Sequence, residues 1–123
     1  MITGEVTADR EAIVSLPIVG ASGEQLKVEA VLDTGFTDHL TLPLAMIAML
    51  QLPYIDSSEF TLADGSTVTM EVYRATVVWD GLDRAIPILA AEGGALAGMS
   101  LLYGSRLTLD VVDGGTVTVE KLL

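Results

Sequence analysis

The sequence predicts an all-β domain, and three features of the 123-residue chain support this prediction. Apolar residues alternate with polar ones, or gather in short blocks of strand-forming residues, as in half-buried strands. Clusters of Gly, Asp and Ser separate these blocks at close intervals, as expected of tight turns. Only Pro43 to Leu52 combines good helix formers with a proline in its first turn, so one short helix is expected there.

Four hairpins follow from pairs of strand-like blocks joined by short turn segments. The Asp64-Gly65 turn is the strongest of these signals, because Asp-Gly readily adopts the backbone of a tight hairpin. Beyond the hairpins, Leu96-Ala97-Gly98 reads as a short strand that leads into one or two helical turns. The expected pairs are Ala12 to Val19 with Gln25 to Leu32, the two arms of Phe60 to Tyr73, Val72 to Asp80 with Arg84 to Leu89, and Arg106 to Val112 with Thr116 to Leu122.

The length of the chain indicates one domain, residues 1–123, with a single core. Residues 1–11 are the part expected to be flexible. They carry Glu5, Asp9, Arg10 and Glu11, where a secretory signal would need a basic start and then an apolar run. The expected location is therefore the cytoplasm.

Composition narrows the classes of ligand and partner. The chain has no cysteine, which excludes disulfides and thiolate metal sites, and the single His39 cannot form a His-rich cluster. No metal and no cofactor are therefore expected. Six basic against seventeen acidic residues give a formal charge of -11, which repels nucleic acid phosphates and anionic lipids. The longest apolar stretch, Leu42 to Leu50, is too short to cross a bilayer, so neither nucleic acid nor membrane is an expected partner.

Asp33 stands at the end of an apolar strand and is followed by Thr34-Gly35. A carboxylate in such a place is costly unless something holds it. Asp33 either accepts backbone N–H groups as a turn residue or takes part in chemistry. Acid–base hydrolysis of a peptide needs two carboxyl groups that share one proton, and this chain has one Asp-Thr-Gly. A two-fold homodimer would supply the second, because an isologous interface places a residue opposite its own copy.

The segment Leu32-Asp33-Thr34-Gly35, with a hairpin before it and Leu96-Ala97-Gly98 far downstream, resembles the retropepsin-like aspartic proteases. These are the single-domain, retroviral-type members of the aspartic proteases, with bacterial relatives. The resemblance runs from about Ala12 to the end of the chain, and the order of elements carries more weight than the triplet. It implies a closed or nearly closed barrel of six to eight strands with one or two short helices, active as a two-fold homodimer.

The resemblance also implies the function, which is hydrolysis of extended peptides by a water molecule held between two Asp33 carboxyl groups. Gly35 would offer its N–H to the carboxylate, and the Thr34 hydroxyl would form a hydrogen bond with the other subunit. The Leu96-Ala97-Gly98 backbone would support the Asp33 loop. The implied flap and substrate-binding residues are Ala63, Asp64, Gly65, Ser66 and Phe36.

Three departures from the family pattern stand out. The family usually places an acidic residue two positions after the first glycine and an arginine after the second, where this chain has Thr37 and Met99. Because both charges are missing together, we expect a rewired dimer interface. Phe36 replaces a small residue and should narrow the adjoining subsite.

Two other functions are compatible with parts of the sequence. The first is an inactive domain of the same fold that serves dimerisation or peptide binding, with Asp33 as a turn residue. The second is an aspartyl-phosphate enzyme, which we discard because it needs a suitably placed lysine in an α/β setting. The only lysines here are Lys27 and Lys121, and the chain is rich in predicted strands.

Overall fold

The computed structural model describes residues 1–123 and confirms the all-β prediction. No helix is long enough and apolar enough to cross a membrane. The strands are β1 (Ile2–Val6), β2 (Ala12–Val19), β3 (Gln25–Leu32), β4 (Leu40–Leu42), β5 (Tyr54–Thr61), β6 (Thr67–Trp79), β7 (Leu82–Ala90), β8 (Ala95–Ala97), β9 (Ser105–Leu109) and β10 (Thr116–Lys121), and the helices are α1 (Leu44–Met49) and α2 (Met99–Leu102).

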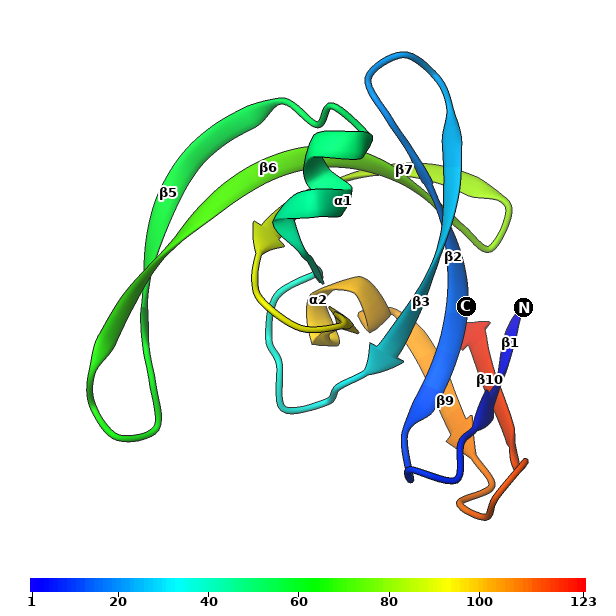
Figure 1. Cartoon of the computed structure of the whole chain (residues 1–123). Coiled ribbons are helices and arrows are strands. Elements are labelled where there is room, and N and C mark those ends of the chain that lie inside the picture. Colours follow the sequence, from blue (N-terminus) through cyan, green and yellow to red (C-terminus); the bar gives the residue numbers. More distant parts are fainter.

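Six of these strands form a closed barrel, in the order β6, β7, β4, β8, β3, β2. The barrel closes where β2 pairs with β6, with Ile18 opposite Val77. The other four strands extend the sheet on two sides. The β5 strand continues outward from β6, and β1, β10 and β9 continue outward from β2 (Figure 1).

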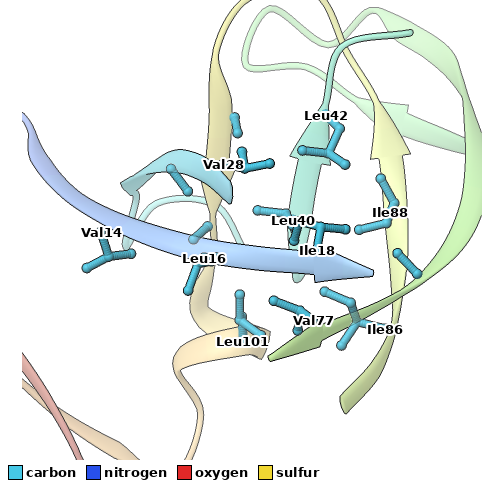
Figure 2. Close-up of a cluster of buried hydrophobic side chains, with 14 of the residues drawn as sticks. Val14, Leu16, Ile18, Val28, Leu40, Leu42, Val77, Ile86, Ile88 and Leu101 are labelled. Atoms are coloured by element: carbon cyan, nitrogen blue, oxygen red, sulfur yellow. The ribbon is translucent and has the colours of Figure 1, made fainter. Parts of the chain in front are cut away.

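The barrel is held together by the alternation of residues along its strands. In β2 the side chains of Val14, Leu16 and Ile18 are buried, while Ser15 between them is exposed. Matching positions on β3, β6 and β7 point the same way, which gives one cluster of 22 buried residues. Figure 2 shows Leu16 and Ile18 of β2 facing side chains from β4, β6, β7 and α2 across the interior.

Two predictions about strands were wrong. No strand was predicted within residues 1–11, but Ile2–Val6 forms β1, which pairs with both β10 and β2. The arms Phe60 to Tyr73 and Val72 to Asp80 were assigned to separate hairpins. They share the single strand β6 of 13 residues, which pairs with β5 at its start and with β7 from Val72 onward.

The helix predicted over Pro43 to Leu52 is present but shorter, with only Leu44–Met49 helical. Pro43 precedes it with an extended backbone, φ -69° and ψ 151°. The helix ends because Gln51 adopts φ 52° and the chain turns back. The Leu52 N–H then donates to the Ile47 carbonyl at 3.1 Å, a bond that closes helix C-termini of this kind.

Candidate active site

The position of Asp33 follows from the way β8 inserts between β3 and β4. The β8 strand runs parallel to β3 and pairs with β4 on its other side. The loop from residue 33 to residue 39 must therefore cross the end of β8. The Asp33 N–H continues the ladder by donating to the Ala97 carbonyl at 2.9 Å, so the backbone of Asp33 is fixed by the barrel itself.

The Asp33 carboxylate is held by the turn that follows it. The Gly35 N–H donates to Oδ1 of Asp33 at 2.9 Å. A Cβ atom at position 35 would lie 3.3 Å from the same oxygen, closer than side chains normally approach, so glycine suits this position. Asp33 is half-buried, whereas Thr34 and Gly35 are exposed. The turn therefore presents an oriented carboxylate and an exposed Thr-Gly backbone at the molecular surface.

Gly98 supports the Asp33 loop from below. Its N–H donates to the His39 carbonyl at 2.9 Å, and the Met99 N–H donates to the Phe36 carbonyl at 2.8 Å. A Cβ atom on Gly98 would lie 2.3 Å from the Asp38 carbonyl oxygen and 2.6 Å from that of Phe36. No side chain fits there. The loop can therefore take this path only over a glycine. The structure of the Asp33-Thr34-Gly35 segment thus depends on Gly98, far downstream in the sequence.

Two further residues brace the same region, and the sequence did not point to them. Thr41 is buried, and its Oγ1 accepts a hydrogen bond from the Leu96 N–H at 2.9 Å, which ties β8 to β4. Arg84 donates to the Leu101 carbonyl at 3.1 Å and lies over the Trp79 ring, 5.9 Å from its centre. The only sequence feature that could have pointed to Thr41 is its hydroxyl within the otherwise apolar strand Leu40–Leu42. No sequence feature pointed to Arg84.

The four predicted flap residues lie together at the tip of the β5–β6 hairpin. Gly65 has φ 86°, and its N–H donates to the Leu62 carbonyl at 2.9 Å, which makes a three-residue loop that needs a glycine at its last position. The Ser66 hydroxyl and N–H both donate to Asp64 Oδ1, at 2.6 and 2.9 Å. Both bonds lower the pKa of Asp64 below its ordinary value, and the bond from the hydroxyl has the larger effect.

The structure groups the predicted residues into two sets. Asp33, Thr34, Gly35 and Phe36 share one loop, whereas the tip of the β5–β6 hairpin stands apart from that loop (Figure 1). The half-buried Phe36 ring packs onto Gly98, with its Cδ2 atom 2.6 Å from where a Cβ would be. Phe36 therefore supports the loop, and its contact with substrate stays a prediction.

A surface cavity of about 460 Å³ lies beside the Asp33 loop, lined by Thr37, His39, Met99, Ser100 and Tyr103. Asp33 itself does not line it. The His39 Nδ1 atom is buried without a hydrogen-bond partner. Burial and the nearby Arg84 charge lower the pKa of His39, and the Asp38 charge opposes them. No group of three or more potential ligand side chains is close enough to hold a metal ion.

Comparisons with known proteins support the fold. No family model matches the sequence, and no curated protein matches it. Solved structures with the same fold include a retropepsin-like aspartic protease from Rickettsia conorii. It has a TM-score of 0.60 and 17% identity, over 98% of this chain and 88% of that one. They also include the Simian Foamy Virus (mac) protease, with a TM-score of 0.53 and 21% identity, over 73% of this chain and 90% of that one. The chain therefore has a retropepsin-like fold, as the order of its elements predicted.

Proposed function

We propose that this protein is an aspartic endopeptidase that acts as a two-fold homodimer. The observation that carries the proposal is the Asp33 carboxylate, held by the Gly35 N–H on a loop that requires Gly98 beneath it. This arrangement occurs in a retropepsin-like fold, and the solved proteins that share the fold are proteases by description.

The chemistry requires two Asp33 side chains, one from each chain. Two carboxyl groups that share a single proton can divide the roles of base and acid. The ionised one takes a proton from the attacking water, and the protonated one gives its proton to the leaving amide nitrogen. Thr34 is exposed beside Asp33 and would donate a hydrogen bond across the axis. We expect a bell-shaped pH dependence of the rate with an acidic optimum, because the two roles need one ionised and one protonated carboxyl group.

The β5–β6 hairpin would cover the bound peptide. One face of this hairpin carries Phe60, Val68 and Met70, which are half-buried, and the other carries Glu59, Thr69 and Glu71, which are exposed. An apolar face of this kind suits the side chains of an extended peptide, whose backbone would pair as an added strand. Substrate would therefore lie between this face and the Asp33 loop.

Mixing subunits tests the shared pair directly. Wild-type protein and Asp33→Asn are combined in equal amounts, and exchange is verified with a size tag on one of them. Random pairing leaves about a quarter of the dimers with two ionisable carboxyl groups. Hydrolysis of an unfolded polypeptide should therefore settle near a quarter of the wild-type rate per dimer.

A complete site within each chain would instead retain about half of the activity, since the variant would only dilute the wild type. That result would overturn the two-fold pair. A protein that binds extended peptides without cleaving them, with Asp33→Asn binding equally well, would favour the inactive peptide-binding domain.

A further inference from the structure

Another surface cavity lies between the turn that joins β6 to β7 and one face of the three strands β1, β10 and β9. Its volume is about 330 Å³, at the lower end of the range for small-molecule sites. Asp33, Thr34, Gly35 and Phe36 do not line it. Figure 1 shows the β6–β7 turn next to the part of the molecule where both chain ends lie. The proposed protease chemistry therefore makes no use of this cavity.

The pairing of β1, β10 and β9 explains one wall of the cavity. Ile2 of β1 lies opposite Val119 of β10, and both side chains line the cavity. Lys121 lies two residues beyond Val119, on the same face, because alternate residues along a strand point the same way. Ser105 of β9 lies opposite Lys121. This wall is therefore apolar, with an ammonium group and a hydroxyl group beside it.

The β6–β7 hairpin forms the facing wall. Trp79 and Leu82 pair across the turn Asp80-Gly81, and all but the glycine line the cavity. Asp80 has φ 52° and Gly81 has φ 80°, and positive φ at both positions is typical of a tight type I′ hairpin turn. The turn therefore holds the Trp79 ring and the Leu82 side chain in fixed positions against the first wall.

Arg84 of β7 also lines this cavity, and no carboxylate binds it. The side chain is half-buried, and its Nη1 atom donates to the Leu101 carbonyl at 3.1 Å. The guanidinium group lies over the Trp79 ring, 5.9 Å from the ring centre. The only ion pair in the structure joins the Met1 amino group to Asp80. Arg84 therefore keeps N–H donors without a protein acceptor in a partly enclosed space, where an unpaired charge is costly.

The charges around the cavity favour an anionic ligand. Arg84 and Lys121 are two of only six basic residues in a chain with seventeen acidic ones, and neither forms an ion pair. Two carboxylates, Asp80 and Asp83, also line the cavity, but Asp80 is already paired with the Met1 amino group. Two unpaired cationic groups therefore face one unpaired carboxylate.

The Trp79 ring argues against a cationic ligand. Cations bind over the face of an aromatic ring, and the Arg84 guanidinium group already lies over this one. A ligand cation would therefore meet a like charge at the place where the ring could attract it.

We propose that this cavity binds a small organic acid, with one carboxylate on an apolar body. The carboxylate would lie between Arg84 and Lys121, because the planar guanidinium group can donate to both oxygens of a carboxylate. The apolar body would pack on Ile2, Val119 and Trp79. The volume of the cavity limits the ligand to a small molecule. The inference does not depend on the proposed protease function.

Trp79 can report on binding, because it is the only tryptophan in the chain and it lines the cavity. The probes are N-acetyl-L-leucine and phenylacetate, an aliphatic and an aromatic acid. Their amides are the matched ligand controls, and phenethylamine tests a cation on a similar body. We expect at least one acid to change the Trp79 fluorescence saturably and to give a matching calorimetric heat, with a dissociation constant of about 1 mM or lower. The corresponding amide and phenethylamine should bind about tenfold more weakly or not at all.

Charge variants at the cavity should change the affinity for the acid in opposite directions. Lys121→Gln removes a cation and should weaken binding about threefold, a modest effect because Lys121 is exposed. Asp83→Asn removes the opposing carboxylate and should tighten binding by about the same factor. Lys27→Gln and Asp9→Asn are the matched controls, because they change the net charge equally and neither residue lines the cavity.

The inference is overturned if neither acid gives a saturable fluorescence change or a binding heat. It is also overturned if the amides bind as well as the acids, or if phenethylamine binds more tightly than both. Equal effects of Lys121→Gln and Lys27→Gln would mean that net charge alone drives binding, which contradicts the site as well. Binding in the expected order supports the site whether or not the protein hydrolyses peptides, so this result stands apart from the test of Asp33.

Discussion

Gly98 is the residue on which the shape of the Asp33 loop depends most directly. The carbonyls of Phe36 and Asp38 lie over it at distances that no Cβ atom tolerates. A methyl group there must push the loop outward, and in the proposed function this loop carries the carboxylate that would share a proton with its counterpart. Small displacements at such sites cost far more rate than stability.

We therefore predict that Gly98→Ala lowers peptide hydrolysis by about a hundredfold. The free energy of unfolding should fall by about 1–3 kcal/mol, the usual range for overpacking. Gly94→Ala is the matched control, because a Cβ at position 94 meets nothing within 4 Å. Rates come from a peptide assay and stability from urea unfolding. Full activity in Gly98→Ala would show that the loop position does not matter for the reaction.

His39 predicts a loss of stability in mild acid. Protonation would add an N–H at the buried Nδ1 atom, which has no acceptor. Burial has the largest effect on His39 and lowers its pKa in the folded chain below the ordinary value of 6.5. The Arg84 charge lowers this pKa further, and the Asp38 charge acts in the opposite direction. As the pH falls, His39 therefore becomes protonated at a higher pH in the unfolded chain than in the folded chain. Stability is greatest above pH 6.5 and falls as the pH drops through the folded pKa.

We predict that the urea midpoint falls between about pH 7.5 and pH 5.5, and that it falls less in His39→Gln. The comparison isolates His39, because the carboxyl groups that titrate in the same range are common to both proteins. An equal fall in both proteins would mean that His39 stays neutral, or is equally protonated, in the folded and unfolded chains.

At the scale of elements, the sequence predicted the hairpins, which depend on local turn residues. It missed the features that depend on pairing between strands far apart in the chain. The β2–β3 and β9–β10 hairpins and the flap turn followed from local Gly, Asp and Ser residues. The continuity of β6 did not, because Val72 and Tyr73 pair with β5 on one side and β7 on the other, and only the register reveals it. The β1 strand was missed for a similar reason, since its main partner, β10, lies at the far end of the chain.

The residues of the candidate site also divide into those that the sequence predicted and those that it did not. The Asp33 triplet and Gly98 carry a recognisable order along the chain, so the sequence pointed to both. Thr41 and Arg84 act through single hydrogen bonds to the backbone of β8 and α2, and such bonds leave no pattern in a sequence.

The flap hairpin yields a prediction about its tip. Gly65 adopts φ 86°, where a β-branched side chain is strained, and the tip is exposed. Gly65→Val should therefore reduce turnover more than it reduces the melting temperature, since the tip would close over substrate in the proposed function but contributes little to the core. Gly23→Val is the matched control, because Gly23 has φ 85° in the exposed β2–β3 turn. Equal turnover in the two variants would show that the hairpin is an ordinary part of the sheet.

At the scale of the whole molecule, the negative net charge of the chain opposes formation of the proposed homodimer. Each chain carries a formal charge of -11, and a dimer brings two such charges together. The seventeen acidic residues are distributed along the whole chain, so much of the repulsion between two copies is long-range. Repulsion of this kind is screened by salt, because the Debye length falls from about 30 Å at 0.01 M to about 10 Å at 0.1 M ionic strength.

Dimerisation at neutral pH should therefore tighten as salt increases. We predict that the dissociation constant of the dimer falls severalfold between about 20 and 200 mM NaCl, and that activity at limiting protein concentration rises in parallel. Sedimentation equilibrium measures the first and a peptide assay the second. A dissociation constant that rises with salt in the wild type would mean that ion pairs between the two chains hold the dimer together.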